Sequence, residues 1–397
     1  MTECDVAIVG GGLVGASLAA ALADTSLQVM LAEAAPPLAS APSWDERCIA
    51  LNDASRRVFE SLGLWGALRA EAEPILATHI SERGRFGTAR FAAAEAGLEA
   101  LGYNVPMRAL GAALASRLAA QQRLRLLQPA RVVAVADRGE AMELSIEHGG
   151  AVETVRARLL VAADGARSPM RAMLGIPAEE RDYGQQAIVS AVHLQRPHRG
   201  VAYERFTEDG PLALIPKPGD AASLVWTVPA ARVESLLTLD DAVYLERALE
   251  VFGGRLGRFT GLGRRSAFPL ARVMSEQLTG PRTVFIGNAA QSLHPVAAQG
   301  FNLGLRDVAA LAGELASAAD PGAADLLAAY AQRRERDRSR VGGLTDLMVR
   351  VFSNRVPGLA QARHWGLVAV DLAAPLRETV LRQHLGHLGL PPSSLAN

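Results

Sequence analysis

Near the N-terminus the sequence carries a glycine pattern whose spacing suits a phosphate group. Gly10, Gly12 and Gly15 fit G-x-G-x-x-G between an expected strand and an expected helix, and Glu33 lies 21 residues beyond Gly12. Such glycines let the backbone approach a pyrophosphate at a helix N-terminus, and the acid can accept hydrogen bonds from ribose hydroxyls. The pattern predicts an ADP-binding site with an unphosphorylated ribose. The alternative, a turn that only packs a helix on a strand, leaves Glu33 unexplained.

Two later turns place glycine beside a polar side chain at the end of an expected strand. Asp164 and Gly165 follow the aliphatic run at 158–163, and Ser168 is a candidate cap for the next helix. A turn of this kind is common as plain architecture. The third segment, 287–307, is longer and more specific, because it joins a glycine turn to a helical pattern that begins near residue 300.

The segments around these motifs indicate the elements that must position them. Short aliphatic runs at 6–9 and 28–33 alternate with a helical pattern at 16–23, which is typical of a parallel sheet covered by helices. Between about 183 and 270 the segments alternate and become aromatic, which predicts an antiparallel sheet. From residue 301 onward the pattern is mostly helical.

Composition excludes several classes of protein. The 397 residues carry 41 basic and 41 acidic side chains, and this balance argues against nucleic-acid binding. Cys4 and Cys48 are too few for a disulfide framework or a cysteine metal site, so we expect no metal and a reducing, cytoplasmic compartment. No run approaches the roughly 20 apolar residues that span a bilayer. The arginines are spread along the chain, so we expect no basic patch and any membrane association to be hydrophobic or through partner proteins.

With the three motifs in this order, the sequence resembles the single-component FAD-dependent aromatic hydroxylases of the para-hydroxybenzoate hydroxylase type over nearly its whole length. The segments 203–214 and 287–307 are most similar to the branch that hydroxylates polyprenyl phenols in ubiquinone biosynthesis. The sequence departs from the broad family in three places, with Asn288 where aspartate is usual, Gln291 where histidine is common and Ala298 where glycine is frequent. Asn288 can still donate or accept a hydrogen bond with a ribityl hydroxyl.

The resemblance implies an α/β fold in which a Rossmann-like FAD-binding domain of the glutathione-reductase type carries an inserted antiparallel β-sheet substrate domain and a helical C-terminus. We expect the FAD-binding domain to comprise residues 1–75, 101–180 and 269–345. The substrate domain would comprise residues 76–100 and 181–268. Residues 346–397 would form the C-terminal helical segment.

The resemblance also implies which residues contact FAD. The glycines of the first motif would hold the pyrophosphate, Glu33 the adenosine ribose and Asp164 the region next to the ribityl chain. Arg47, placed before a helix expected to start at Ile49, and Arg108 would contact the cofactor, although either is more commonly a solvated residue. The full expected cofactor-binding set is Gly10, Gly12, Gly15, Glu33, Arg47, Arg108, Asp164, Gly165, Gly287, Asn288, Gly300, Phe301 and Asn302.

The implied reaction uses NAD(P)H as a transient co-substrate to reduce FAD, and O2 then gives a C4a-hydroperoxide that hydroxylates 2-polyprenyl-6-methoxyphenol. His294 is the nearest candidate for a base by motif position, but a packed histidine is an equally good interpretation. Phe206, Leu212 and Leu214 are candidates to line the substrate, or else ordinary sheet core.

Other functions stay open at this stage. The same motifs fit a sister hydroxylase that acts on another ring carbon or another aromatic compound, a flavin reductase that never inserts oxygen, and a non-catalytic FAD-bearing scaffold. The expected partners are a lipophilic phenol and, beyond it, the inner-membrane surface or a complex of ubiquinone-biosynthesis proteins. The sequence does not indicate an oligomeric state.

Overall fold

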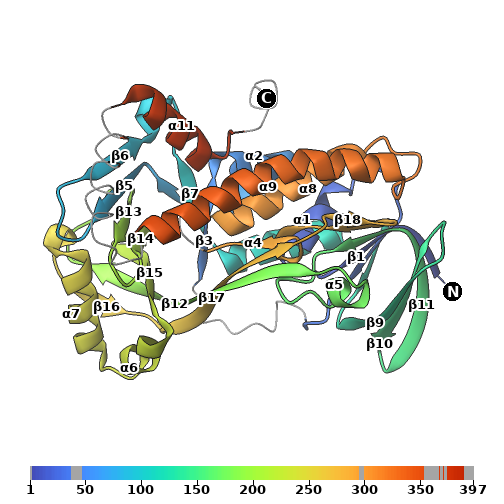
Figure 1. Ribbon diagram of the computed structural model, residues 1–397, viewed down its shortest axis with the longest axis horizontal. Helices are drawn as coiled ribbons and strands as arrows, with labels where there is room; N and C mark the ends of the chain where they lie inside the picture. The colour runs from blue at the N-terminus through green and yellow to red at the C-terminus, as the bar shows by residue number, and fades with distance from the viewer. Residues whose placement is uncertain are drawn as a thin grey trace.

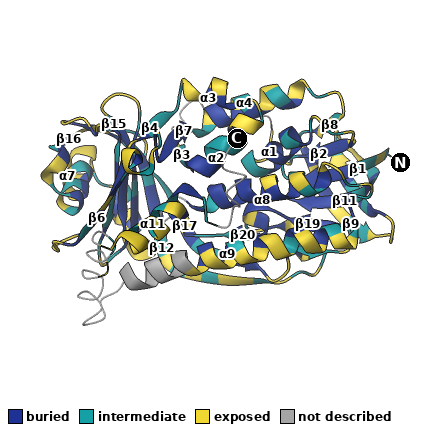
Figure 2. Cartoon of the chain, turned by 90° about the horizontal axis from the view of Figure 1, so that it is seen from above, coloured by how far each residue is buried: buried dark blue, intermediate teal, exposed yellow. Residues whose placement is uncertain are grey.

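The computed structural model describes residues 2–36, 47–294, 299–352 and 373–388, together with positions 366 and 370. Figure 1 shows an elongated molecule with a sheet at each end. Two long helices, α8 (Gln299–Leu315) and α9 (Ala324–Phe352), run side by side along it. Figure 2 shows that α8 is mostly buried, whereas the described part of α9 has an exposed side.

The sheet nearer the N-terminus contains a parallel layer built on β1 (Thr2–Val9). Val6, Ala7 and Ile8 are fully buried, because helices and neighbouring strands cover the layer, and this explains an aliphatic run without alternation. The strand order is β18-β19-β11-β1-β2-β8, with β10 and β9 added antiparallel to β11. The other strands are β2 (Val29–Ala32), β8 (Leu124–Leu127), β9 (Ala130–Asp137), β10 (Met142–His148), β11 (Ala151–Ala162), β18 (Thr279–Gly280) and β19 (Thr283–Phe285).

The second sheet has nine strands and is mostly antiparallel, in the order β20-β17-β12-β15-β14-β13-β5-β6 with β16 beside β12. Its longest strands, β12 and β17, extend toward the first sheet in Figure 1. One face packs on helices α6 and α7 to form a second core around Leu224 and Tyr244. The strands are β5 (Ala77–Glu82), β6 (Thr88–Ala92), β12 (Ala178–Leu194), β13 (Val201–Phe206), β14 (Leu212–Pro216), β15 (Ala221–Pro229), β16 (Phe259–Leu262), β17 (Ser266–Ser275) and β20 (Gln291–Ser292).

A small antiparallel sheet, β3-β7-β4, lies between these two ends. Its strands are β3 (Cys48–Asn52), β4 (Glu73–Ile75) and β7 (Gly102–Pro106). The remaining helices are α1 (Leu13–Ala21), α2 (Asp53–Ser61), α3 (Trp65–Arg69), α4 (Met107–Ala119), α5 (Pro169–Met173), α6 (Val233–Leu237), α7 (Asp241–Phe252) and α11 (Ala374–Leu385), with short 3-10 turns η2 (Ala93–Ala96), η3 (Ala230–Arg232), η4 (Gly254–Leu256) and η5 (Gly287–Ala289).

The expected fold class is confirmed: α/β, with a mostly antiparallel sheet inserted and a helical C-terminal region. One local prediction is wrong. The chain after Arg47 does not start a helix at Ile49 but forms β3, and the helix starts at Asp53. The Asn52 side chain caps that helix by accepting a hydrogen bond from the Ser55 N–H at 2.9 Å.

Candidate active site

The first glycine motif forms a tight crossing between β1, α1 and the end of β11. Gly10 has φ +104°, and a Cβ atom there would lie 2.4 Å from the Ala163 carbonyl oxygen. A Cβ atom on Gly15 would lie 1.9 Å from the Gly10 carbonyl oxygen. Both contacts involve backbone atoms that cannot move aside, so these two glycines are required by the packing of the protein itself.

Gly12 differs from its neighbours, because a Cβ atom on it would meet no protein atom within 4 Å. It is the N-cap of α1, and no side chain caps that helix end. The first turn of a helix leaves N–H groups without partners inside the helix, and its dipole favours a negative charge. The open space at Gly12, the N–H groups of the first turn of α1 and the dipole of that helix therefore all fit the pyrophosphate of FAD.

Glu33 lies directly beside this loop. One carboxylate oxygen accepts a hydrogen bond from the Gly11 N–H at 2.5 Å, and the other accepts one from the Ala35 N–H at 2.7 Å. A carboxylate has about four acceptor positions, so it can still accept bonds from ribose hydroxyls. These contacts explain how the acid is held at the loop.

The Asp164 carboxylate is held by the start of α5. It accepts hydrogen bonds from the Ser168 hydroxyl at 2.6 Å and from the Met170 N–H at 2.9 Å. Burial raises the pKa of Asp164 against these bonds, which lower it. Gly165 next to it has φ +88° and open space at its Cβ position. A contact of Asp164 with the cofactor stays a prediction, and the side chain already has a structural role.

The turn at Gly287 and Asn288 is anchored from below by a buried carboxylate. The Gly287 N–H donates to Asp307 at 2.9 Å, and the Gln291 amide donates to the same carboxylate oxygen at 2.6 Å. The Arg334 guanidinium donates to the other Asp307 oxygen at 2.7 Å. Asn288 itself is exposed and reaches the cavity described next. The acid that organises this turn is therefore Asp307, whereas residue 288 is free to face a ligand.

The start of α8 is pinned to β3 by one side chain. Asn302 accepts a hydrogen bond from the Asn52 N–H at 3.0 Å and donates to the Ala50 carbonyl at 2.9 Å, as a neighbouring strand would. Gly300, Phe301 and Asn302 all line the same cavity. A Cβ atom on Gly300 would meet no protein atom within 4 Å, so this helix end also leaves room for a ligand.

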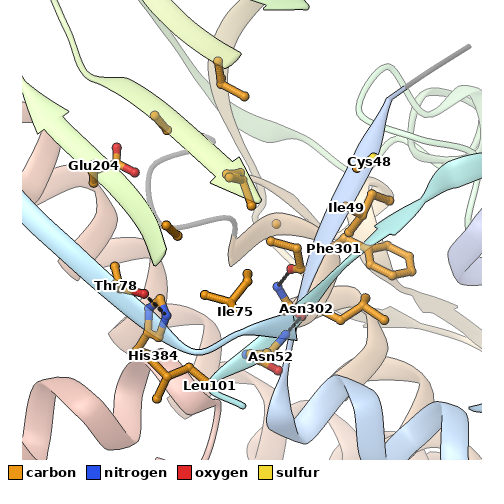
Figure 3. Close-up of a pocket in the computed structure, with 18 of the residues that line it drawn as sticks. Cys48, Ile49, Asn52, Ile75, Thr78, Leu101, Glu204, Phe301, Asn302 and His384 are labelled. Atoms are coloured by element: carbon orange, nitrogen blue, oxygen red, sulfur yellow. Dashed lines mark hydrogen bonds between the residues drawn. The ribbon is translucent and has the colours of Figure 1, made fainter. Parts of the chain in front are cut away.

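A cavity of about 350 Å³ lies where the start of α8, the small sheet and the antiparallel sheet meet. This volume is in the range of small-molecule sites. Its walls are mostly apolar, as Figure 3 shows. They include Ile49, Leu51, Ile75, Leu101, Ala202, Pro211, Ala213, Ile215, Val225, Leu293 and Phe301, with Asn52, Thr78, Thr227, Asn288, Ser292 and Asn302 as uncharged polar members.

Four further lining residues can ionise, and one of them is Tyr203 next to Glu204 on β13, whose hydroxyl pKa is raised by burial. Glu204 on β13 lies on the opposite side of the cavity from Phe301 in Figure 3. Burial raises the pKa of Glu204 from its ordinary value of 4.5 to about 7. His384 of α11 contacts the Thr78 hydroxyl at 3.5 Å, and burial lowers its pKa. Cys48 is half-buried at the end of β3.

Several predicted residues lie outside this cavity. The Arg47 guanidinium is exposed and lies 5.5 Å from the centre of the Phe268 ring. Arg108 is exposed and forms an ion pair with Glu71. His294 is fully buried against Tyr183, and burial lowers its pKa to about 4. His294 is not among the described residues that line the cavity, so its role as a base stays a prediction.

Leu212 and Leu214 are not among the described residues that line this cavity, and their positions fit the alternative of ordinary sheet core. Both are buried in the second core, on the face of β14 that packs toward α6 and α7. Side chains alternate along a strand, so Ala213 and Ile215 face the cavity instead. Phe206 is buried as well and does not appear among the described lining residues.

Glu204, Thr78 and His384 are not among the site residues that the sequence predicts. They come from three segments far apart in the chain, and their local patterns show no chemical motif. The only available signal was Glu204 itself, a charged residue inside the alternating run 201–206. Within the part of the chain that the structure describes, no cluster of histidine, cysteine or acidic residues could hold a metal ion.

Comparisons with known proteins show the family of this chain. The family model described as an FAD binding domain matches residues 3–341. The chain belongs to this FAD-binding family. The ubiquinone hydroxylase UbiL of Rhodospirillum rubrum is 39% identical over 393 residues, 98% of this chain and 91% of that protein. The 3-demethoxyubiquinol 3-hydroxylase of Escherichia coli is 35% identical and covers 96% of this chain and 98% of its own length.

Solved structures show the same fold. The p-nitrophenol 4-monooxygenase PnpA of Pseudomonas putida superposes with a TM-score of 0.79 at 16% identity, covering 97% of this chain and 99% of its own. The resemblance to FAD-dependent aromatic hydroxylases is thus confirmed. The chain is an FAD-dependent, NAD(P)H-using aromatic-ring monooxygenase.

The two kinds of glycine lead to a prediction about FAD binding. Gly12→Val should yield folded protein that purifies without FAD, because the new side chain meets no protein atom but fills the pyrophosphate position. Gly15→Val should fail to fold, because its Cβ atom would overlap the Gly10 carbonyl. Circular dichroism and the flavin absorption spectrum check both results.

Gly66 in α3 supplies a matched control, since a Cβ atom there also meets no protein atom. Gly66→Val should fold and remain yellow. A folded Gly12→Val protein with one FAD per chain would contradict the assignment of this loop.

Proposed function

We propose that this enzyme hydroxylates the aromatic ring of a polyprenyl phenol, 2-polyprenyl-6-methoxyphenol, in ubiquinone biosynthesis. The observation that carries the proposal is the apolar cavity at the start of α8, which combines a size suited to one substituted ring with few polar side chains. Such walls favour a ring with hydrophobic substituents over a charged substrate. The names of the relatives UbiL and 3-demethoxyubiquinol 3-hydroxylase support the same class of substrate.

When bound, FAD supplies the redox and oxygen chemistry of the reaction. The glycine loop at Gly12 would hold its pyrophosphate, Glu33 its adenosine ribose, and the cavity-lining Asn288 and Gly300 its other end. The remaining members of the expected cofactor set, Arg47 and Arg108 included, are proposed contacts on the strength of the resemblance alone.

The protein around the cavity must orient the phenol and keep water away. The apolar side chains of β3, β14 and β15 perform the second task. The N-terminus of α8 would place the positive end of its dipole toward the cavity, which stabilises a nearby negative charge by about 0.3–1 kcal/mol, and up to about 2 when partly buried. This contribution requires no charged side chain at the helix end.

The setting of the enzyme is part of the proposal. Among the described residues, no helix is long and apolar enough to cross a membrane. We propose a cytoplasmic enzyme that meets its lipophilic substrate at the inner-membrane surface or within a complex of biosynthetic proteins. The division into an FAD-binding domain, a substrate domain and a C-terminal segment at the stated boundaries belongs to the same proposal.

A sister reaction at another ring carbon is the second candidate. It is favoured by the name of the Escherichia coli relative, which specifies hydroxylation at position 3 of a demethoxyubiquinol. The cavity walls are mostly apolar, and apolar contacts bind a ring without defining which carbon is attacked.

The test is turnover with a short-tailed 2-prenyl-6-methoxyphenol. We expect this phenol to stimulate NAD(P)H and O2 consumption and to yield a product that has gained one oxygen atom, detected by mass spectrometry. Nuclear magnetic resonance of the product then identifies the ring carbon. Phenol-independent NAD(P)H oxidation with no oxygenated product would refute the proposal in favour of a reductase.

A further inference from the structure

Glu204 is the one carboxylic acid among the described residues that line the cavity. Its partners in neighbouring strands are Ile80 on β5 and Ala213 on β14, so the side chains beside it on that face do not ionise. Among the described residues, no hydrogen bond or ion pair joins its carboxylate, and the next cation on its own strand, Arg205, bonds the Val251 carbonyl on the opposite face.

The other ionisable groups of the cavity do not supply a positive charge that would stabilise the Glu204 carboxylate. His384 is occupied with Thr78, and burial lowers its pKa, so it favours the neutral form. Cys48 is the first residue of β3. Burial raises the pKa of the Tyr203 hydroxyl, so Tyr203 also favours its neutral form. A carboxylic acid kept in an apolar wall without a cation destabilises the substrate-free protein, because burial disfavours the charged form.

We propose that Glu204 binds the hydroxyl of the phenol and accepts its proton as the ring is hydroxylated. In this step the phenolic O–H bond breaks, its electron pair stays with the ring system, and the proton joins a Glu204 oxygen. The inference rests on the proposed function, since it assigns a role in that same cavity.

The direction of proton transfer is consistent with the acidity of both groups. A free phenol has a pKa near 10, so an ordinary carboxylate would lie about 5.5 units below it. Burial raises the pKa of Glu204 to about 7, which narrows the difference to about 3 units. The remaining difference falls when the ring is attacked, because the phenol oxygen then becomes electron-poor and more acidic. Glu204 therefore accepts the phenol proton as the ring is attacked, and not before.

The test compares Glu204→Gln with wild-type holoenzyme across pH. In the wild type we expect hydroxylation to increase as pH rises through about 7, because the carboxylate is the active form. Glu204→Gln should lower kcat by about 100-fold and remove this increase of the rate with pH. The variant should still bind FAD. Glu204→Asp should restore part of the increase of the rate with pH. Glu147→Gln, the same change at an exposed position of β10 outside the cavity, should keep both the rate and its increase with pH.

A second readout does not depend on turnover. The pKa of Glu204 is higher in the folded protein than in the unfolded chain, so the folded state binds the extra proton and loses stability as pH rises from about 4.5 to 7. The Tm of Glu204→Gln should therefore exceed that of the wild type at pH 8 more than at pH 5.

The two hypotheses fail in different ways. Wild-type enzyme that hydroxylates no phenol would overturn the proposed function. Wild-type hydroxylation together with an unchanged rate and pH dependence in Glu204→Gln, or an equal loss in Glu147→Gln, would overturn the role of Glu204 alone.

An independent observation concerns the hairpin that joins β5 to β6. At its tip Phe86 is 97% exposed, and Arg83 and Arg85 beside it are exposed as well. Exposure of a large aromatic side chain directly after two cations costs solubility and no core contact compensates for it. Such a combination is typical of segments that enter the headgroup region of a membrane.

Other arginines gather near this hairpin. Burial is the largest cause that lowers the pKa of Arg205, and the positive charges of Arg255 and Arg83 lower it further. These three cations therefore lie close together. Arg90 and Arg255 also lower the pKa of the buried His79 on β5. The arginines spread along the sequence therefore converge in the fold, which corrects the expectation that no basic patch exists.

The cluster is defined by Arg83, Arg85, Arg90 and Arg255. In the described part of the chain none of these four forms an ion pair, although Glu82 is buried beneath the hairpin. Exposed arginines elsewhere commonly have a carboxylate partner, as Arg69 has in Glu99. The cluster thus gathers positive charge at the end of the molecule that carries Phe86.

We infer that this hairpin docks on an anionic lipid surface, with Phe86 inserted among the headgroups and the arginine cluster on the lipid phosphates. Thr78 lines the cavity on the same strand, four residues before Glu82, a rise of about 13 Å. Docking there would hold the cavity close to the membrane in which a polyprenyl phenol dissolves.

Vesicle co-sedimentation of the full-length holoenzyme tests this surface. We expect binding to phosphatidylcholine vesicles that contain phosphatidylglycerol, weak binding without it, and loss of binding at high salt. Each arginine near the surface contributes roughly five-fold in affinity, so Arg85→Gln with Phe86→Ser should weaken binding at least tenfold. The matched control is Arg131→Gln with Val152→Ser at the opposite end, where Val152 is 61% exposed; it should bind like the wild type.

A water-soluble short-tailed phenol separates docking from catalysis, because the hairpin variant should hydroxylate it at the wild-type rate. Equal vesicle binding by wild type and hairpin variant would overturn the inference. Binding to polyglutamate but not to anionic vesicles would overturn it in favour of an acidic protein partner.

Discussion

The buried carboxylate of Asp307 is the interaction on which the site depends. It joins the turn after β19, through Gly287 and Gln291, to Arg334 of α9, and it lies on α8 itself. Removing one member of such a buried ion pair typically costs about 3–5 kcal/mol, because the other charge is left without a partner. One side chain thereby fixes the cofactor-facing turn and the direction of the helix that starts at the cavity. Arg306 and Asp337 extend the same network between the two helices.

Asn302 connects that helix to the wall of the cavity. The Asn302 amide forms two hydrogen bonds with the backbone of β3, as a neighbouring strand would. These bonds tie the small sheet to the start of α8. The parallel sheet holds the glycine loop by backbone packing, whereas the antiparallel sheet presents one face to its own core and the other to the cavity. The glycine loop and the antiparallel wall of the cavity therefore belong to different sheets, and α8, β3 and the turn after β19 contribute the rest of the cavity lining. This arrangement leaves the substrate wall free to vary without disturbing the FAD site.

Local patterns predicted what depends on local geometry. The turn at Gly10–Gly15, the acid Glu33 and the fold class could be predicted because strand, turn and helix are contiguous in sequence. The face of β14 could not, since apolar residues at 212–215 occupy both faces and give no alternation. Ile49 was assigned to a helix because an aliphatic run cannot distinguish a short buried strand from a helix. Glu204 and the arginine cluster were missed because both depend on pairing between distant strands, which no local pattern encodes.

Many charged side chains in the described part of this protein have a partner of opposite charge, and Glu204 and the arginine cluster are informative exceptions. Asp307 has three donors, Asp53 bonds Arg57 and His387, and many exposed carboxylates bond an arginine. A fold able to place so many partners could neutralise Glu204 by one arginine in place of Ile80, or the hairpin by one acid in place of Arg85. Leaving a carboxylic acid in an apolar cavity and four cations around an exposed ring disfavours the isolated protein in both places. Each exception is relieved by a specific companion, a phenol hydroxyl for the acid and an anionic surface for the cations, so the same lipid-borne phenol explains both.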